Sequence, residues 1–218
     1  SAEHAGAKDV WLIHEPMAAA IGIGIDVLEP KGNMVIDIGG GTTEIAVISL
    51  GGIVCDKSIR VAGDEFTDNI KNYMKTRHNI AIGDIMAEQT KIYVGSALTE
   101  LEEPPPNYAV HGRDLMSGIP KEVIVTYKEI AGALNNSIEQ IEEAVMSALF
   151  NTPPALSADI YNEGVYLTGG GSMLRGLDKR ISRKTKLPVY VAEDPLRAVA
   201  RGTGIALKNT ENYSFLIQ

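Results

Sequence analysis

The chain has 218 residues, of which 44% are hydrophobic and 22% are charged, a composition typical of one large or two small globular domains and not of a disordered or fibrous protein. Its net charge of -8 produces a long-range field that repels polyanions, so nucleic acid is not expected as a partner. Cys55 is the only cysteine, which excludes an internal disulfide and a multi-cysteine metal site, and the lack of a secretory signal pattern favours the cytoplasm.

The first third of the chain alternates short apolar runs with turns. Residues 10–13 predict a short strand, and Glu15-Pro16 then favours a helix over residues 16–27, because proline fits the first turn of a helix. Both alternating faces of residues 44–48 are mostly apolar, which indicates a strand inside a sheet that is covered on both sides. Strands joined by glycines at hairpin spacing are expected at 34–38, 43–50 and 53–60.

The rest of the chain predicts helices and strands around one insertion. Helices at 63–77 and 84–98 precede a Pro-rich segment, 102–107, that fits neither a helix nor a central strand. With strands at 108–113 and 123–127, this segment indicates a small inserted α+β subdomain. Thr126 and Glu129 form a capping-box pattern before a long helix that Pro153-Pro154 ends. The last expected elements are a strand at 165–168, a helix at 173–186, a strand at 189–191, a helix at 195–208 and an apolar tail packed against the rest.

A glycine-rich turn follows the first strand of the predicted hairpin. Backbone N–H groups without neighbouring Cβ atoms can approach an anion closely, and hydroxyl groups add donors, so the turn suits phosphate. Asp37 would then hold Mg²⁺ through water, because a carboxylate beside phosphates needs a cation between them. The alternative is a glycine-rich hairpin with a capping aspartate. The motif consists of Asp37, Ile38, Gly39, Gly40, Gly41, Thr42 and Thr43.

A second glycine-rich turn, Gly169-Gly170-Gly171-Ser172, lies between the strand at 165–168 and the helix expected from Met173. Backbone donors at the start of a helix can bind an anion or a ribose, whereas a single turn of this kind often serves only close packing. Neither turn matches the P-loop or the complete dinucleotide-binding pattern. Two such turns in one chain nevertheless favour a nucleotide site.

Five motifs together resemble the actin, Hsp70 and sugar-kinase superfamily, and within it the MreB family of bacterial actins that determine cell shape. The resemblance implies an α/β, actin-like (ribonuclease H-like) mixed sheet flanked by helices. It also implies two large domains that bind ATP and Mg²⁺ between them, in subunits that assemble into filaments. The motifs occur in the family's order at Glu15 to Gly22, Asp37 to Thr43, Val61 to Phe66, Glu88 to Lys91 and Leu167 to Gly176.

The resemblance implies roles for individual residues. Residues 39–43 would form the second phosphate hairpin, with Asp37 as the carboxylate on the Mg²⁺ side. Glu88, Gln89 and Lys91 would contact the nucleoside, and residues 169–173 would form the adenosine loop. Glu15 would orient the attacking water with the help of Thr42, or it would instead stabilise the N-terminus of a helix.

The same resemblance divides the chain. Residues 1–31 would be a remnant of the first actin-like domain, 32–79 and 121–193 the second large domain, 80–120 an inserted small subdomain, and 194–218 a helix and tail that return to the first domain. The family's earlier phosphate hairpin, built around Asp-x-Gly-Thr, is not found in this sequence. The chain is therefore expected to be part of a longer ATPase and to hydrolyse ATP poorly by itself.

The partners implied by the resemblance are other copies of the protein in a filament and the wall-synthesis and membrane scaffold proteins. The expected location is the cytoplasm near the inner face of the membrane, with membrane contact only through regions outside this chain. Two alternatives stay open: another superfamily ATPase, such as a chaperone or a sugar or acetate kinase, and a non-catalytic interaction module. A chaperone would need a peptide-binding domain after the last helix, and a kinase would need a substrate pocket that the sequence does not reveal.

A cluster of basic residues occupies the helix expected at 173–186. Such a run is typical of a solvated helix face, and the alternative is a surface for an acidic neighbour or nucleic acid. The residues are Arg175, Lys179, Arg180, Arg183, Lys184 and Lys186.

Overall fold

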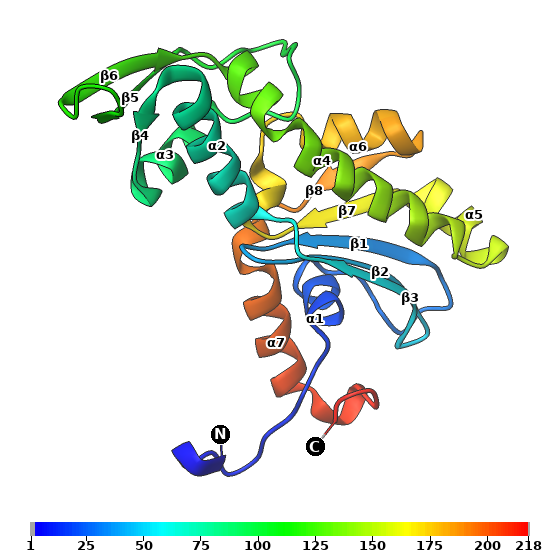
Figure 1. Ribbon diagram of the computed structural model, residues 1–218. Helices are drawn as coiled ribbons and strands as arrows, with labels where there is room; N and C mark the ends of the chain where they lie inside the picture. The colour runs from blue at the N-terminus through cyan, green and yellow to red at the C-terminus, as the bar shows by residue number, and fades with distance from the viewer. Residues whose placement is uncertain (1–2, 218) are drawn as a thin grey trace.

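The computed structural model describes residues 3–217, so the predictions for residues 1, 2 and 218 lie outside the described residues. Two sheets organise the chain, one with five strands in the order β3-β2-β1-β7-β8 and one with three strands in the order β4-β5-β6 (Figure 1). The strands are β1 (Asn33–Ile38), β2 (Thr43–Ser49), β3 (Gly52–Ile59), β4 (Ile80–Ala81), β5 (Tyr108–Asp114), β6 (Pro120–Val125), β7 (Val165–Thr168) and β8 (Val189–Val191). The α-helices are α1 (Glu15–Gly22), α2 (Gly63–His78), α3 (Asp84–Val94), α4 (Tyr127–Phe150), α5 (Pro154–Glu163), α6 (Leu177–Thr185) and α7 (Ala198–Lys208). Short 3₁₀ helices are η1 (Glu3–Ala5), η2 (Gly170–Met173), η3 (Pro195–Arg197) and η4 (Thr210–Asn212).

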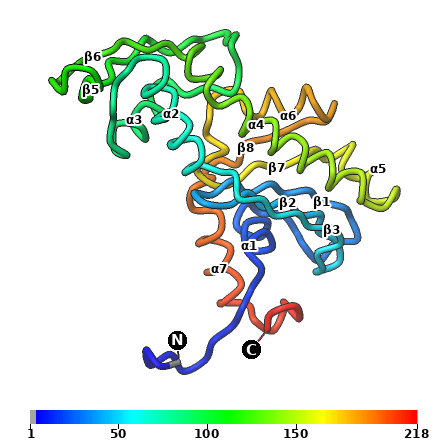
Figure 2. Tube along the Cα trace, viewed as in Figure 1, coloured from blue at the N-terminus to red at the C-terminus, as the bar shows by residue number. Residues whose placement is uncertain are grey.

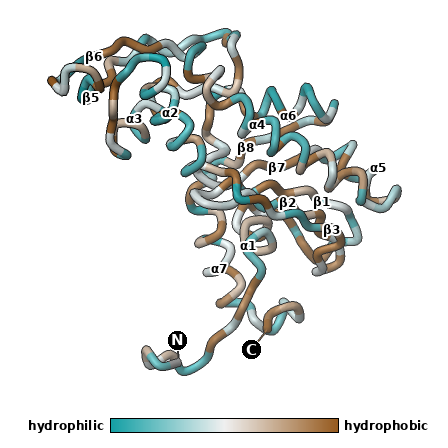
Figure 3. Tube along the Cα trace, in the orientation of Figure 1, coloured by the Kyte–Doolittle hydropathy of each residue, from teal (hydrophilic) through white to brown (hydrophobic). Residues whose placement is uncertain are grey.

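The five-stranded sheet is mixed, and its central strands are buried on both faces. Strand β1 pairs antiparallel with β2 and parallel with β7, and β7 pairs parallel with β8. Every residue from Met34 to Ile38 and from Ile45 to Ser49 is buried, and the hydrophobic colouring gathers in these central strands (Figure 3). The predicted mixed sheet flanked by helices is confirmed, because a strand that is apolar on both faces is stable only between two layers.

The two faces of this sheet support different helices. Met34, Ile36 and Ile38 belong to the larger core, which also contains residues of α2, α4 and α6. Val35 and its neighbours on β2 belong to a second core with residues of α1 and α7, and Figure 1 shows α1 and α7 on the opposite side of the sheet from α4 and α5. Because side chains alternate along a strand, Asp37 points to the same face as Val35. Its carboxylate therefore faces the side that carries α1 and α7.

Helices α1 and α7 cross at a contact of small residues. A Cβ atom on Gly202 would overlap the carbonyl oxygen of Ala18 and lie 2.8 Å from the backbone nitrogen of Gly22. A Cβ atom on Gly22 would likewise overlap the carbonyl oxygen of Ala198. Only glycine at both positions allows the two backbones to approach this closely.

Helix α4 is the longest helix, and its start matches the sequence. The Thr126 hydroxyl accepts a hydrogen bond from the Glu129 N–H at 3.3 Å, and a Glu129 carboxylate oxygen accepts one from the Thr126 N–H at 2.9 Å. This reciprocal pair is the capping box that the sequence predicts. Among the helices of residues 3–217, none combines the length and the apolar character that a bilayer crossing requires.

The small sheet connects to the rest through two chain segments. Helix α2 ends at His78, Asn79 adopts a left-handed conformation with φ 54°, and the chain enters β4. It returns from β6 through Thr126 into α4. Strand β6 lies almost entirely beyond the boundary predicted at residue 120, and the division into domains itself stays a prediction.

Two predictions at the start of the chain are wrong. Residues 10–13 form no sheet strand, because only Leu12 makes an isolated bridge, to Ile217. The helix predicted over 16–27 ends at Gly22, where the chain turns through Gly24 with φ 88°. Figure 2 shows both terminal segments on the side of the sheet that carries α1 and α7, and the Leu12–Ile217 bridge joins them. The predicted packing of the C-terminal tail is confirmed for Tyr213, Phe215 and Leu216, which contact the second core.

Later in the chain two predicted helices need correction, and one helix is not predicted at all. The helix predicted over 84–98 ends at Val94. Helix α5 is not predicted, because Pro153-Pro154 indicates the end of α4, whereas Pro154 in fact occupies the first turn of a new helix. The helix predicted over 173–186 begins only at Leu177, after a 3₁₀ turn and Gly176 with φ 74°.

Candidate nucleotide site

The two glycine turns lie side by side at one edge of the large sheet. Strands β1 and β7 are parallel neighbours in which Asp37 pairs with Thr168, so both turns leave the sheet at the same edge. The Thr168 hydroxyl donates a hydrogen bond of 2.9 Å to Asp37 Oδ1. Gly169 has φ 79°, and a Cβ atom there would overlap the carbonyl oxygen of Ile38 and lie 2.5 Å from Asp37 Oδ1. Glycine is thus required for the second turn to reach the first.

The first glycine turn docks onto the start of α2 through its carbonyl groups. The Gly63 N–H donates to the Gly39 oxygen at 3.1 Å, and the Asp64 N–H donates to the Gly40 oxygen at 2.8 Å. Within residues 3–217, the N–H groups of Gly40 and Gly41 donate no hydrogen bond. The turn therefore keeps free donors at its tip, as an anion-binding turn requires.

A cleft of about 670 Å³ opens between the two turns, the start of α2 and one side of α3. Seven of the residues that the resemblance indicates line it: Gly39, Gly40, Glu88, Lys91, Gly170, Gly171 and Met173. The sequence assigned no site role to the other lining residues, which are Gly63, Asp64, Phe66, Ile92, Gly95, Leu174, Arg175 and Leu196. A cleft with apolar walls and a few fixed polar groups is typical of a small-molecule site.

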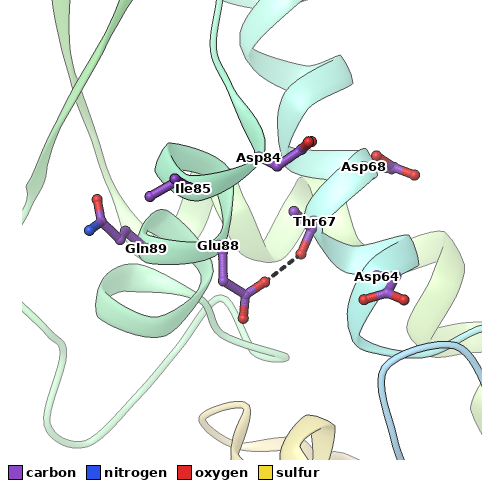
Figure 4. A pocket seen from close by; sticks show the side chains of 7 residues that line it. All are labelled: Asp64, Thr67, Asp68, Asp84, Ile85, Glu88 and Gln89. Carbon is purple, nitrogen blue, oxygen red and sulfur yellow. Dashed lines mark hydrogen bonds between the residues drawn. The ribbon is translucent and has the colours of Figure 1, made fainter.

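Glu88 and Lys91 belong to one network at the side of this cleft. Lys91 Nζ lies 2.7 Å from Glu88 Oε2, and it donates to the Gly63 carbonyl at 2.8 Å and to the Thr67 hydroxyl at 3.0 Å. Thr67 and Glu88 point toward one another from α2 and α3 (Figure 4), with 2.8 Å between Thr67 Oγ1 and Glu88 Oε2. Burial alone would raise the pKa of Glu88, but the hydrogen bonds from Lys91 and Thr67 hold that pKa below its ordinary value. Glu88 is therefore ionised and held in place.

Gln89 faces a different space from the cleft. Gln89 is among the residues that line a neighbouring groove of about 450 Å³, and in Figure 4 its side chain points away from Glu88. Asp64 and Glu88 border both spaces. Gln89 thus shares the neighbouring groove with Glu88 but does not line the cleft that Glu88 and Lys91 line.

Asp37 lies among carboxylates at the same edge of the sheet. It is only 4% exposed, and burial raises its pKa; the Thr168 hydrogen bond opposes this, while the charges of Glu15 and Glu44 raise the pKa further. Burial and the charge of Glu15 likewise raise the pKa of Glu44. A cation at this edge would relieve the repulsion, so the donor set fits a divalent ion. Among residues 3–217, no three His, Cys, Asp or Glu side chains are grouped to hold a metal ion directly.

Two residues predicted to contact the nucleotide, Thr43 and Ser172, hydrogen-bond to backbone carbonyls near the turns and do not line the cleft. The Thr43 hydroxyl is buried and donates to the Val61 carbonyl at 2.6 Å. The Ser172 hydroxyl is also buried and donates to the Gly169 carbonyl at 2.7 Å. Both hydroxyl hydrogens are thus already used by the backbone. Thr42 is half-buried beside them, outside the cleft lining.

Arg175 closes the far wall of the cleft. Its Nη1 donates to the Ile92 carbonyl at 2.9 Å, at the C-terminal end of α3, where a cation also interacts favourably with the helix dipole. Its backbone carbonyl accepts a hydrogen bond of 2.8 Å from the Ala97 N–H. Sequence reasoning placed Arg175 on a basic helix face and therefore missed this role.

The chain matches the MreB/Mbl protein family over residues 1–214. It is 46% identical to the cell shape-determining protein Mbl of Bacillus subtilis (strain 168) over 211 residues. This aligned region covers 97% of the chain and 63% of Mbl. It is 49% identical to the cell shape-determining protein MreB of Escherichia coli (strain K12) over 210 residues, and this aligned region covers 95% of the chain and 59% of MreB. The chain thus spans 59% to 63% of the length of these relatives.

Solved structures give the same picture of the fold. MreB5 of Spiroplasma citri bound to AMPPNP superposes with a TM-score of 0.92 at 40% identity, over 97% of this chain and 63% of that one. The same protein bound to ADP gives a TM-score of 0.93. A MamK double helical filament gives a TM-score of 0.71 at 22% identity, over 90% of this chain and 58% of that one, which is a likeness of fold alone. The predicted actin-like α/β fold is confirmed.

Proposed function

Because the chain belongs to the MreB/Mbl family of actin-like, cell shape-determining proteins, we propose that it carries the ATP-binding half-site of a filament-forming cytoskeletal protein. One observation carries the proposal most directly: two glycine turns meet at one edge of a mixed sheet, beside a cleft of about 670 Å³ that contains an ionised, fixed Glu88. The chain spans less than two thirds of its relatives, so the activity of the whole protein is part of the proposal.

The cleft would hold the nucleoside. Its apolar walls, including Phe66 and Leu174, suit the flat faces of a base. Glu88 would accept hydrogen bonds from the ribose hydroxyls, since Lys91 and Thr67 already fix the position of its carboxylate. The AMPPNP and ADP bound to the Spiroplasma citri protein support a nucleotide as the ligand.

The phosphates would lie over the first glycine turn. The free N–H groups of Gly40 and Gly41 would donate to phosphate oxygens. Asp37 faces the α1 side of the sheet, so it would hold water molecules of a Mg²⁺ ion there. When bound, Mg²⁺ would neutralise phosphate charge and the mutual repulsion of Asp37, Glu15 and Glu44.

Hydrolysis in the whole protein would use residues on the same side. Glu15 is exposed at the start of α1, and its charge acts on both Asp37 and Glu44. It would accept a hydrogen bond from the attacking water, with the Thr42 hydroxyl assisting. The other possibility for Glu15 is stabilisation of the α1 dipole, because it is the acidic residue in the first turn.

The cellular setting follows from the family. We propose a cytoplasmic protein near the inner face of the membrane that associates with itself in filaments and with wall-synthesis and membrane scaffold proteins. Support comes from the cell shape-determining relatives and from the likeness of fold to the MamK filament. Cosedimentation of the full-length protein with and without ATP tests self-association, and equal pelleting in both conditions would contradict nucleotide-dependent assembly.

Isothermal titration of the 218-residue chain with ATP and Mg²⁺ tests nucleotide binding directly. Glu88→Gln should weaken ATP binding about tenfold or more, because hydrogen bonds to a charged group contribute roughly 1.5–3 kcal/mol. Asp68→Asn is a matched control, since it also removes one negative charge beside the neighbouring groove but lies outside the cleft. Equal effects of the two variants, or a wild-type chain that binds no ATP, would contradict the proposal.

A further inference from the structure

In the basic cluster between Arg175 and Lys186, only some of the cations form hydrogen bonds or ion pairs with other parts of the fold. Arg175 binds the end of α3, Lys179 pairs with Glu102 at 3.1 Å, and Arg180 pairs with Glu142 at 3.1 Å. The three cations that follow have no ion pair among residues 3–217. They are Arg183, Lys184 and Lys186, in and just after the last turn of α6, which is coloured as strongly hydrophilic in Figure 3.

Arg183 lies between two cavities that share part of their lining. One, of about 620 Å³, is lined by Tyr161, Ser182, Arg183, Lys186, Leu187 and Pro188. The other, of about 300 Å³, is lined by Asp178, Lys179, Ser182, Arg183 and Val189. Since Ser182 and Arg183 border both, the two cavities form one groove along α6, which we call the α6 groove. It combines cations with the exposed ring of Tyr161 and with apolar Leu187 and Pro188.

The α6 groove runs beside an open edge of the large sheet. Among residues 3–217, strand β8 is the last strand of that sheet, and β7 is its only strand neighbour. The Pro188 carbonyl and the Ala192 N–H bond to β7, at 2.9 Å each. Because backbone direction alternates along a strand, the N–H and C=O groups of Val189 and Val191 point away from β7. An unpaired row of this kind is a template for another extended chain.

We propose that the α6 groove binds an acidic, extended polypeptide segment of a partner protein. The main chain of this segment continues the sheet beside Val189 and Val191, and its carboxylates reach Arg183 and Lys186. An alternating sequence places all of its acidic residues on one face of the added strand, toward Arg183 and Lys186. Cations at a helix C-terminus also offset the helix dipole, but that role accounts for neither the groove nor the open strand edge.

The observations favour a polypeptide over nucleic acid. The whole chain has a net charge of -8, which opposes the approach of a long polyanion. The local positive charge comes from a single helix end, and part of the groove surface is apolar. A short segment with a few carboxylates and an extended backbone matches both the size and the chemistry of this surface.

Fluorescence anisotropy with the full chain tests the proposal, using a labelled octapeptide of alternating glutamate and leucine. Arg183→Glu should weaken peptide binding roughly tenfold or more, because reversing a contacting charge replaces attraction with repulsion. Lys184→Glu should change it by no more than about twofold, since Lys184 makes the same charge change on the same helix but does not line the groove. Arg183→Gln gives an intermediate loss and serves if the reversed variant does not fold, as judged by its thermal melt.

Three results would overturn the inference. They are no binding of the octapeptide to the wild-type chain, equal losses in the Arg183 and Lys184 variants, and equal or tighter binding of an oligothymidine with the same dependence on Arg183. Hydrogen exchange tests the strand pairing separately. Bound peptide should slow amide exchange at Val189 and Val191, and unchanged exchange there would exclude the addition of a strand to β8.

Discussion

The crossing of α1 and α7 gives the sharpest test of the fold, through the variant Gly202→Ala. The new methyl group would overlap the Ala18 carbonyl oxygen and lie 2.8 Å from the Gly22 nitrogen, so both neighbours are backbone atoms of α1. Neither can turn aside as a side chain would. The helices must therefore separate, although every residue of α1 from Pro16 to Gly22 is buried.

The expected loss of stability combines two opposing effects. Overpacking a close contact costs about 1–3 kcal/mol, and the rigid backbone neighbours place this site at the upper end. Replacing glycine by alanine inside a helix returns about 0.5–1 kcal/mol. Gly202→Ala should thus lower the free energy of unfolding by about 2 kcal/mol, and the melting temperature by about 4–8 °C for a chain of this size.

Gly204→Ala in the same helix is the matched control. A Cβ atom there meets no atom within 4 Å, so only the helix-propensity gain of about 0.5–1 kcal/mol should remain. Urea denaturation followed by circular dichroism measures both variants under one set of conditions. If Gly202→Ala proved as stable as Gly204→Ala, the close approach of the two helices, and with it the position of Glu15, would be wrong.

The remaining predictions concern one ion pair and two site residues. Glu142→Ala should destabilise the chain by about 3–5 kcal/mol in urea denaturation, because it leaves the Arg180 guanidinium, only 15% exposed, without its partner; a loss below about 1 kcal/mol would show that solvent reaches the pair. Asp37→Asn should raise the melting temperature of the nucleotide-free chain at neutral pH while it weakens Mg²⁺-dependent ATP binding. The native pKa of Asp37 lies above 3.8, so the native state holds this proton more tightly than the unfolded state and loses stability as pH rises through the native pKa. In thermal melts from acidic to neutral pH, the stability gain of Asp37→Asn should therefore disappear toward low pH. A gain that stayed constant with pH would show that ionisation of Asp37 is not its cause. Gly169→Ala should lower the stability by about 1–3 kcal/mol and abolish ATP binding in calorimetry, because its φ of 79° and the Ile38 carbonyl leave no room for a Cβ, and wild-type behaviour would show that the turns are not in contact.

The first glycine turn was predictable because its signal is local. The seven residues from Asp37 to Thr43 contain the strand end, the glycines and the return strand in one stretch. The capping box at Thr126 is similarly local, since both partners lie within one helical turn. In each case the residues that make the structure are also neighbours in the sequence.

Other parts of the site depend on contacts that the sequence does not show. Asp64 lies in the motif from Val61 to Phe66, but its place in the cleft results from the docking of α2 onto the Gly40 carbonyl. The burial of Thr43 and Ser172 hydroxyls depends likewise on backbone groups that only the fold brings near. Residue type identified a possible donor in each case, whereas its partner was decided by tertiary packing.

The false strand at residues 10–13 has a related cause. Its apolar pattern fits a strand, but its actual partner is Ile217, more than two hundred residues away, and the two meet only at Leu12. The unpredicted α5 shows the opposite error, because Pro154 both ends one pattern and fits the first turn of the next helix. Apolar runs and prolines restrict the local backbone conformation, but they do not determine which distant segment a strand pairs with or whether a new helix follows.

Helix α2 connects the first glycine turn to the small sheet as one rigid element. Its first N–H groups hold the carbonyls of Gly39 and Gly40, and its last residue, His78, leads directly toward β4. Sixteen residues at 1.5 Å each make a stiff rod about 24 Å long. A tilt of about 5° at the turn would carry the far end through about 2 Å, so this rod would amplify a small adjustment around a phosphate group into a displacement at the rim of the molecule.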